Sequence, residues 1–394
     1  MDNNNAGDEI MTEMTSRERV RATINHVEPD RVPLDLGGGC STSIAVEGYE
    51  KLKQYLGISG HTQKLSEIFR IAQLDRSVLQ QLGSDCHPIV TKSPLNWISP
   101  PSEPGTFVDN WGIKWKQTYY ADGCYYWDVI HSPLEQARVE DLESYSWPDV
   151  ADPGYTAGLA LEARTLHEET QYAILGDSGF QSHWEMGFLL RGYKRILMDL
   201  RRNPGFVTEL MSKVLEINMT VTGRFLDAVG QYLDVIRTSD DLATQEGLVL
   251  SPSMYRDFLK PVHKKFFDFI KSKTDAKVFY HSCGNIVELI DDLVEIGVDI
   301  INPVQVAAMG DTAKLKARFG EKVIFWGGID TQKVMPRGSP EDITAEVRRR
   351  IHDLAPRGGY VLAAVHNIQP DVPPRNIVAM AKAARELGAY PLAV

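Results

Sequence analysis

The chain has 394 residues, a formal net charge of -11 and 43% hydrophobic residues. This length and apolar content can bury a large core, in two or three domains or in one α/β barrel with additions. The acidic balance argues against a nucleic-acid-binding surface. Four cysteines in so long a chain do not form a disulfide framework, which favours a reducing, cytoplasmic setting. No apolar run approaches the roughly 20 residues that span a bilayer, so we expect no membrane segment.

The first residues, 1–14, are expected to form a short flexible tail that precedes a helix. Thr15 and Glu18 have the spacing of a capping box at the start of this helix. Three apolar residues then recur at helical spacing, namely Val20, Ile24 and Val27. Prolines 29 and 33 end the pattern, and a short buried strand over 34–36 is expected before the glycines at 37–39.

Between residues 106 and 130 the sequence pattern changes. Aromatic and β-branched residues cluster there around the turn sequences Asp109-Asn110 and Ala121-Asp122-Gly123. This pattern predicts one or two β-hairpins. We interpret the stretch at about 105–131 as a hairpin insertion within a single domain that spans 15–394.

From about Tyr172 onward, short apolar runs alternate with amphipathic stretches. The expected strands are 172–175, 235–236, 278–280, 299–301, 323–325 and 360–365. The expected helices include 252–272, 287–296, 340–354 and 374–387. Alternating strands and helices favour parallel pairing. With further strands at 34–36 and 86–90, the count reaches about eight, the number that a (β/α)8 barrel needs. A doubly wound open sheet is the main alternative.

Polar residues follow almost every expected strand. The clusters are Gly176-Asp177-Ser178, Thr238 to Asp241, His281-Ser282-Cys283, Asn302 to Gln305, Gly327 to Asp330 and His366 to Gln369. Barrel active sites are built at the carboxyl ends of strands, so we expect these clusters to share one mouth. The candidate substrate-binding residues are Asp35, Asp177, His183, Gln305, Asp330 and Asn367. The alternative is that these loops are merely polar.

Three residues form a candidate metal site. His281 and Cys283 are two apart at a strand end, so their side chains point to the same side. His366 ends another expected strand. Nitrogen and sulfur ligands suit zinc better than calcium or magnesium, and catalytic zinc keeps three protein ligands and one open position. The alternative is that Cys283 is a buried hydrophobic residue and His281 a hydrogen-bonded core residue.

Two adjacent carboxylates, Asp240 and Asp241, follow a buried strand. Consecutive residues face opposite ways, so one of them is expected to enter the mouth, where it could ligate a metal or hold a proton as a general acid. Solvated loop aspartates are the alternative. We select Asp240 and Glu185 as candidate catalytic residues.

Several stretches carry a family resemblance. They are Thr15 to Val20, Asp30 to Pro33, Ser239 to Pro252, His281 to Gly284, Asn302 to Gln305, Trp326 to Asp330 and His366 to Gln369. Together they resemble the uroporphyrinogen decarboxylase superfamily, which implies a (β/α)8 barrel with its cleft at the strand carboxyl ends. The superfamily contains cofactor-free decarboxylation of a porphyrinogen and zinc-dependent methyl transfer to or from a corrinoid protein.

Two departures argue against the decarboxylase branch. That branch carries an arginine-rich segment near its N-terminus that pairs with substrate carboxylates, whereas Gly37 to Ser43 of this chain contain no arginine. Its F-S-D motif, which holds the catalytic aspartate, has no counterpart between Asp85 and Lys92. The resemblance therefore favours the methyltransferase branch.

The methyltransferase branch uses a His-x-Cys pair and a later Cys. His281 and Cys283 match the pair, and His366 stands at the third position. We therefore predict an enzyme that uses zinc to move a methyl group between a small methoxy or methylthio substrate and a corrinoid (cobalamin) carried by a separate protein. The imidazole in place of a thiolate leaves less negative charge on the metal, which favours an oxygen substrate. A homodimer is implied by the resemblance alone. The alternatives are a metal-free lyase that acts on a carboxylated substrate and a non-enzymatic ligand-binding barrel.

Overall fold

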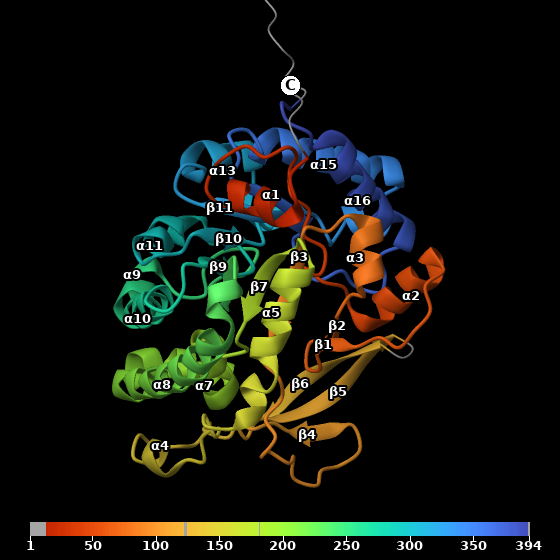
Figure 1. The fold of residues 1–394 in the computed structure, drawn as a ribbon. Helices are drawn as coiled ribbons and strands as arrows, with labels where there is room; N and C mark the ends of the chain where they lie inside the picture. The colour runs from red at the N-terminus through yellow and green to blue at the C-terminus, as the bar shows by residue number, and fades with distance from the viewer. Residues whose placement is uncertain (1–12, 122–123, 181, 393–394) are drawn as a thin grey trace, which may run out of the picture.

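The computed structural model describes residues 13–121, 124–180 and 182–392, and its centre is a parallel sheet (Figure 1). The sheet strands are β3 (Cys86–Val90), β7 (Ala173–Asp177), β8 (Val235–Ser239), β9 (Lys277–His281), β10 (Ile300–Asn302), β11 (Ile324–Ile329) and β12 (Tyr360–Ala364). Their order is β12-β11-β10-β9-β8-β7-β3, and neighbouring strands pair in parallel. The expected strands from 86 onward are therefore confirmed, with their ends shifted by a few residues.

The segment 33–36 occupies the gap between the two edges of this sheet. On one side, the N–H of Asp35 donates to the carbonyl of Leu362 in β12 over 2.9 Å. On the other side, the N–H of Asp85, next to β3, donates to the carbonyl of Leu34 over 2.8 Å. The segment thus takes the eighth strand position, and the (β/α)8 architecture is confirmed in place of the open sheet.

The helices surround the strands (Figure 1). In the first half they are α1 (Ser16–Thr23), α2 (Val46–Leu56), α3 (Arg76–Leu82), α4 (Asp141–Ser144), α5 (Leu159–Glu169), α6 (Trp184–Arg191), α7 (Tyr193–Arg202) and α8 (Pro204–Val229). In the second half they are α9 (Pro252–Met254), the π-helix η3 (Tyr255–Leu259), α10 (Lys260–Lys271), α11 (Ile290–Glu295), α12 (Val306–Met309), α13 (Thr312–Phe319), α14 (Val334–Arg337), α15 (Pro340–Leu354) and α16 (Pro374–Leu387). Short 3₁₀ turns occur at η1 (Pro153–Thr156), η2 (Gly230–Tyr232) and η4 (Val287–Leu289). The helices expected at 252–272, 287–296, 340–354 and 374–387 are confirmed.

Helix α1 closes the amino-terminal end of the barrel. The predicted capping box is present, because Thr15 and Glu18 bond reciprocally at its start. Val20 and Ile24 pack with inward-facing strand residues such as Phe279. Val27 was expected on the same face, but it is 54% exposed because the helix ends at Thr23. With this end plugged, the carboxyl ends of the strands form the accessible mouth.

A separate antiparallel sheet stands beside the barrel, toward the lower edge of Figure 1. It consists of β4 (Thr106–Val108), β5 (Lys114–Ala121) and β6 (Cys124–His131), which confirms the predicted hairpins. The hydroxyl of Tyr126 donates to Gln369 Oε1 over 2.9 Å and so ties the sheet to the loop after β12. A two-stranded piece, β1 (Lys64–Ser66) and β2 (Ile71–Ala72), completes the strands. Among the described residues, no helix is long and apolar enough to cross a membrane. The tail assigned to 1–14 lies mostly outside the described residues.

Candidate functional site

The three predicted metal ligands meet at the barrel mouth. His281 is the last residue of β9, Cys283 follows it by two positions, and His366 lies two residues beyond β12. One ligand atom from each residue lies within 4.8 Å of the other two. The Sγ of Cys283 is 3.5 Å from Nε2 of His281, and the two imidazole centroids are 5.7 Å apart. The strand ends thus deliver an N, S, N donor set to one point, while metal binding itself stays a prediction.

Neighbouring amides orient both imidazoles. Nδ1 of His281 bonds to Asn302 Oδ1, and Nδ1 of His366 bonds to Asn367 Oδ1 over 2.8 Å. The amide of Asn302 is itself fixed, because its nitrogen donates to the carbonyl of Trp326 over 3.0 Å. An oxygen acceptor requires that Nδ1 carry the proton, so Nε2 keeps its lone pair. This is the tautomer that binds a metal through Nε2, with an outer partner on the other nitrogen.

Burial sets the charge of the three donors. It lowers the pKa of His281 and of His366, so both imidazoles are neutral, which is the form that ligates metal. Burial, followed by the nearby Asp241 and Glu185, raises the pKa of the Cys283 thiol. A coordinated metal would reverse the last effect, because a coordinating thiol is deprotonated. The residues present therefore fit a zinc ion.

Two carboxyl groups lie close to this donor set. Asp241 Oδ1 accepts the backbone N–H of Cys283 over 2.7 Å and so fixes the loop that carries the thiol. Glu185 Oε2 accepts the hydroxyl of Ser182 over 2.7 Å. Burial, and then the negative charges of Asp241 and Asp240, raise the pKa of Glu185 to about 8. Glu185 therefore keeps its proton near neutral pH and can act as an acid.

Asp240 takes a different position from the one that its predicted catalytic role requires. Its side chain is fully buried, and its Oδ1 accepts the N–H of Glu185 over 2.9 Å. Its Oδ2 bonds to the N–H of His183 over 2.8 Å and to Nε2 of His263 over 2.9 Å. Both oxygens thus hold the start of α6 and tie it to α10. Of the adjacent pair, Asp241 faces the donor set, and we transfer the candidate role to it.

His183 was selected as a substrate-binding residue, but the structure places it in the interior. Its ring is 1% exposed and packs edge-on against Phe266, with centroids 4.8 Å apart. Together with Asp240 and His263 it forms a second buried group whose ligand atoms lie within 4.8 Å of one another. The hydrogen bonds of Asp240 account for this group as a buried link between the start of α6 and α10.

The other predicted substrate-binding residues mostly support the mouth. Asp35 is fully buried and accepts Nε1–H of Trp326 over 2.8 Å, and burial raises its pKa to about 6. Gln305 Oε1 accepts the N–H of Gly284, next to Cys283, over 2.7 Å. Asp330 Oδ1 accepts two backbone N–H groups of the following turn. Asn367 holds His366, as described above. Their role toward a substrate stays a prediction.

Arg237 is a mouth residue that the sequence reasoning missed. It lies in the middle of β8, and its side chain is 15% exposed. Its Nη1 donates to Asp177 Oδ2 over 3.2 Å, and its Nε donates to Ser41 Oγ over 3.2 Å. Arg237 shares the inward face of β8 with Val235 and Ser239 at a period of two, but it lies just beyond the expected strand 235–236, so this pattern was not recognised.

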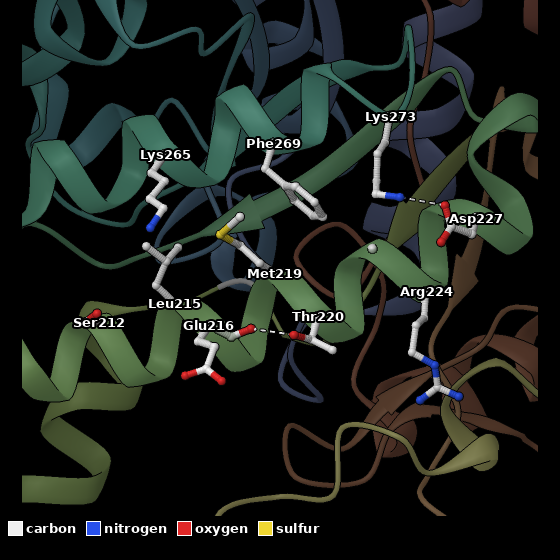
Figure 2. A pocket seen from close by; sticks show the side chains of 11 residues that line it. Ser212, Leu215, Glu216, Met219, Thr220, Arg224, Asp227, Lys265, Phe269 and Lys273 are labelled. Carbon is white, nitrogen blue, oxygen red and sulfur yellow. Dashed lines mark hydrogen bonds and ion pairs between the residues drawn. The ribbon is translucent and has the colours of Figure 1, made fainter. Parts of the chain in front are cut away.

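A groove on the outer wall has no connection to these residues. Figure 2 shows Phe269 of α10 and Lys273, which follows α10, facing α8, with Met219 and Asp227 opposite them. The ion pair between Lys273 and Asp227, 2.7 Å long, crosses the groove. It contains no mouth residue, and we assign it no chemistry.

Comparisons with known proteins identify the family. A family model described as "Uroporphyrinogen decarboxylase (URO-D)" matches residues 133–387, which include all three candidate ligands. A uroporphyrinogen decarboxylase from Pseudoalteromonas translucida is 32% identical over 278 residues, which cover 67% of this chain and 74% of that protein. One from Xanthomonas euvesicatoria is 28% identical over 177 residues, which cover 42% of this chain and 48% of that protein.

A solved structure shares the fold. A methyltransferase from Methanosarcina mazei superposes with a TM-score of 0.63 at 19% identity, over 95% of this chain and 99% of that one. The family match and the relative at 32% identity together exceed what a shared fold alone would give. The chain belongs to the uroporphyrinogen decarboxylase family.

Proposed function

We propose that this chain is a zinc-dependent methyltransferase, which moves a methyl group between a small methoxy or methylthio substrate and a corrinoid carried by a separate protein. The observation that carries the proposal is the meeting of His281, Cys283 and His366 within 4.8 Å at the mouth. Because Asn302 and Asn367 hold the Nδ1 atoms, both imidazoles keep an Nε2 lone pair that, with the thiol, can ligate one cation.

The donor set favours an oxygen substrate. Two neutral imidazoles and one thiolate leave a net positive charge on a bound zinc ion, which would supply Lewis-acid polarisation of the substrate heteroatom. Asn302 and Asn367 keep both imidazoles in the ligating tautomer. Asp241 holds the backbone of Cys283 and so fixes the position of the thiolate.

Glu185 is the proposed proton donor. In the demethylation direction, the bond between oxygen and the methyl carbon breaks while that carbon bonds to cobalt(I), which becomes methyl-cobalt(III). The substrate oxygen keeps the electron pair of the broken bond and takes the proton of Glu185. A carboxyl that stays protonated near neutral pH suits this task, and it is re-protonated from solvent between turnovers. In the reverse direction Glu185 accepts the proton.

The experiment uses free cob(I)alamin as the methyl acceptor. The zinc-loaded protein is incubated with cob(I)alamin and a panel that contains methanol, methoxyarenes and methylthio compounds, and methylcobalamin is followed by its absorption spectrum. We expect methylcobalamin with at least one methoxy compound, and loss of the reaction in Cys283→Ser. Cys124→Ser, in strand β6 and outside the donor set, is the matched control and keeps the parent rate. No methylation by the parent with any panel member, or equal rates in Cys283→Ser, contradicts the proposal.

A metal-free lyase that acts on a carboxylated substrate is the second candidate. Two observations favour it: the relatives named uroporphyrinogen decarboxylase, and the interior cation Arg237. This candidate predicts release of carbon dioxide from uroporphyrinogen that a strong chelator leaves unchanged. The zinc enzyme predicts no such release, so one assay with and without chelator separates the two candidates.

A further inference from the structure

A small cavity lies inside the barrel, beside the loop at 37–42. Gly38, Gly39 and Ser41 line it from the loop, and Asp177, Arg237 and Phe279 line it from β7, β8 and β9. In the parallel pairing of β8 with β9, Arg237 lies opposite Phe279 and Ser239 lies opposite His281, so the cavity lies two residues below the level of the donor set inside the barrel. Neither the family match nor the predicted metal site explains this cavity.

Arg237 has unused hydrogen-bonding capacity in this cavity. A guanidinium carries five N–H donors. The contacts of Arg237 are Nε to Ser41 and Nη1 to Asp177, each 3.2 Å long. Its Nη2 makes no hydrogen bond to any residue that the structure describes. Because a mostly buried cation with free donors is costly, the site favours an acceptor group on a ligand.

The loop offers additional donors next to this guanidinium. The backbone N–H groups of Gly39 and Ser41 bond to nothing within residues 13–121, 124–180 and 182–392. A Cβ on Gly39 would come no closer than 4.0 Å to the Cδ of Arg237, so the loop leaves open space there. Gly38 has no such room, since its Cβ would lie 2.5 Å from Asp35 Oδ1. These N–H groups are available as additional donors to an anion held by the neighbouring guanidinium.

The remaining walls indicate an organic acid. Phe279 and Leu175 give the cavity an apolar side, and its volume of about 10 Å³ admits little more than one polar head group, so the body of a ligand would extend toward the mouth. Asp177, which already pairs with Arg237, disfavours a doubly charged ligand such as phosphate. A carboxylate carries one negative charge and matches the planar fork of a guanidinium.

We propose that Arg237 and the 37–42 loop bind the carboxylate of the small substrate, so that the substrate class is a methoxylated or methylthio organic acid. The identification of this acid as the substrate rests on the proposed function, whereas its binding does not require the metal. The carboxylate would anchor one end of the molecule at Arg237, and the methyl-bearing end would face His281, Cys283 and His366.

The test is calorimetric binding of 4-methoxybenzoate, 4-methoxybenzamide and inorganic phosphate to the full chain. We expect the parent to bind the acid at least tenfold more tightly than the amide, and phosphate more weakly than the acid. Arg237→Met is expected to weaken acid binding by about 10- to 100-fold while the amide changes little. Arg318→Met, on the exposed face of α13, is the matched control and keeps the parent affinity. Equal affinities for acid and amide, tighter binding of phosphate, or unchanged binding in Arg237→Met overturns the proposal.

A second variant, Arg237→Lys, and titrations of chelator-treated protein distinguish failure of this inference from failure of the proposed function. Arg237→Lys keeps the charge without the planar fork, so we expect an affinity between those of the parent and Arg237→Met, and parent-level affinity contradicts the bidentate arrangement. The titrations are repeated on chelator-treated protein. Acid binding is expected to persist after chelation, and failure of the same protein to form methylcobalamin once zinc is restored defeats the proposed function and leaves this inference standing. A zinc-loaded protein that binds acid and amide equally does the opposite.

Discussion

The two ends of the barrel both bury charge, and they do it differently. At the amino-terminal end, the fully buried Asp85 accepts from Arg19 over 2.7 Å, from Arg31 over 2.9 Å and from the backbone N–H of Leu34 over 2.8 Å. At the carboxyl end, Nη2 of Arg237 makes no hydrogen bond to the described residues, and His281, Cys283 and His366 bring three potential ligand atoms within 4.8 Å of one another. The charged groups at the amino-terminal end are fully paired and stabilise the fold. Those at the carboxyl end keep unpaired positions, which is typical of functional groups.

The same distinction applies within the mouth. Asp240 and Asp241 are neighbours in sequence, yet Asp240 uses both oxygens to hold α6 and α10. One carboxylate oxygen of Asp241 accepts the backbone N–H of Cys283. Proximity to a mouth is therefore a weaker guide to catalysis than the number of hydrogen-bonding positions that the fold leaves open.

The largest effect is expected from the metal ligands. His281→Ala and His366→Ala should each lower the rate of methylcobalamin formation by about 10³-fold or more, because Lewis-acid stabilisation worth several kcal/mol is lost. The thermal midpoint of each variant should stay close to that of the zinc-free parent, since these side chains hold no part of the core. A rate within tenfold of the parent in both variants would place the chemistry elsewhere.

At the amino-terminal end of the barrel, a substitution should lower the stability of the fold without changing the zinc content. Asp85→Ala leaves Arg19 buried without its partner, which costs about 3–5 kcal/mol in the free energy of unfolding. Urea titration measures this loss, and the zinc content of the folded fraction should stay at the parent level. Asp291→Ala, at an exposed ion pair on α11, is the control and should barely move the midpoint. A change in Asp85→Ala no larger than in the control would remove the distinction between the two ends.

A smaller effect is expected from the amides that orient the imidazoles. Asn302→Ala should weaken zinc binding by about 10- to 100-fold, because His281 loses the acceptor that fixes its tautomer. Competition with a chelator of known affinity gives the ratio. Asn376→Ala removes an equally buried asparagine at α16, and it should lower stability without changing zinc affinity. Equal zinc affinities in the parent and in Asn302→Ala would argue against a ligand role for His281.

The last prediction concerns the pH dependence of stability that Glu185 introduces. Its pKa is raised in the folded chain, so it holds a proton that the unfolded chain has already lost, and folding stability falls as pH rises between the two pKa values. The window runs from about 4.5 to about 8, with a slope of at most about 1.4 kcal/mol per pH unit. Asp240, Asp241 and Arg237 are the charged groups that share this environment.

Glu185→Gln mimics the protonated carboxyl and isolates this contribution. The thermal midpoint of the parent should fall relative to that of Glu185→Gln between pH 5 and pH 8, measured in zinc-free protein. Parallel curves for the two proteins across this range would show that the pKa of Glu185 is not raised.

Much of the fold was predictable because its signals are local. Periodic apolar runs from Tyr172 onward indicated the strands, and the capping box at Thr15 placed α1. Residues two apart on a strand indicated that His281 and Cys283 would point together, and equivalent strand ends brought in His366. Helices α6 to α8 were not delimited, although α7 and α8 each carry apolar residues at helical spacing on one buried face.

The errors at the mouth concern choices that only three-dimensional packing makes. The orientation of Asp240 depends on His263, which lies 23 residues away on α10. The inward direction of Arg237 depends on the register of β8 in the closed barrel. Val27 followed the helical period, but the helix ended before it. The sequence pattern thus located the candidate site. It did not determine which side chains face the donor set and which hold the neighbouring helices.

The most direct test of the central claim is elemental analysis of the purified protein. If His281, Cys283 and His366 hold a catalytic metal, the parent should carry close to one zinc per chain, and Cys283→Ser should lose most of it. Less than about 0.2 zinc per chain in the parent, or the same zinc content in Cys283→Ser, would contradict the account.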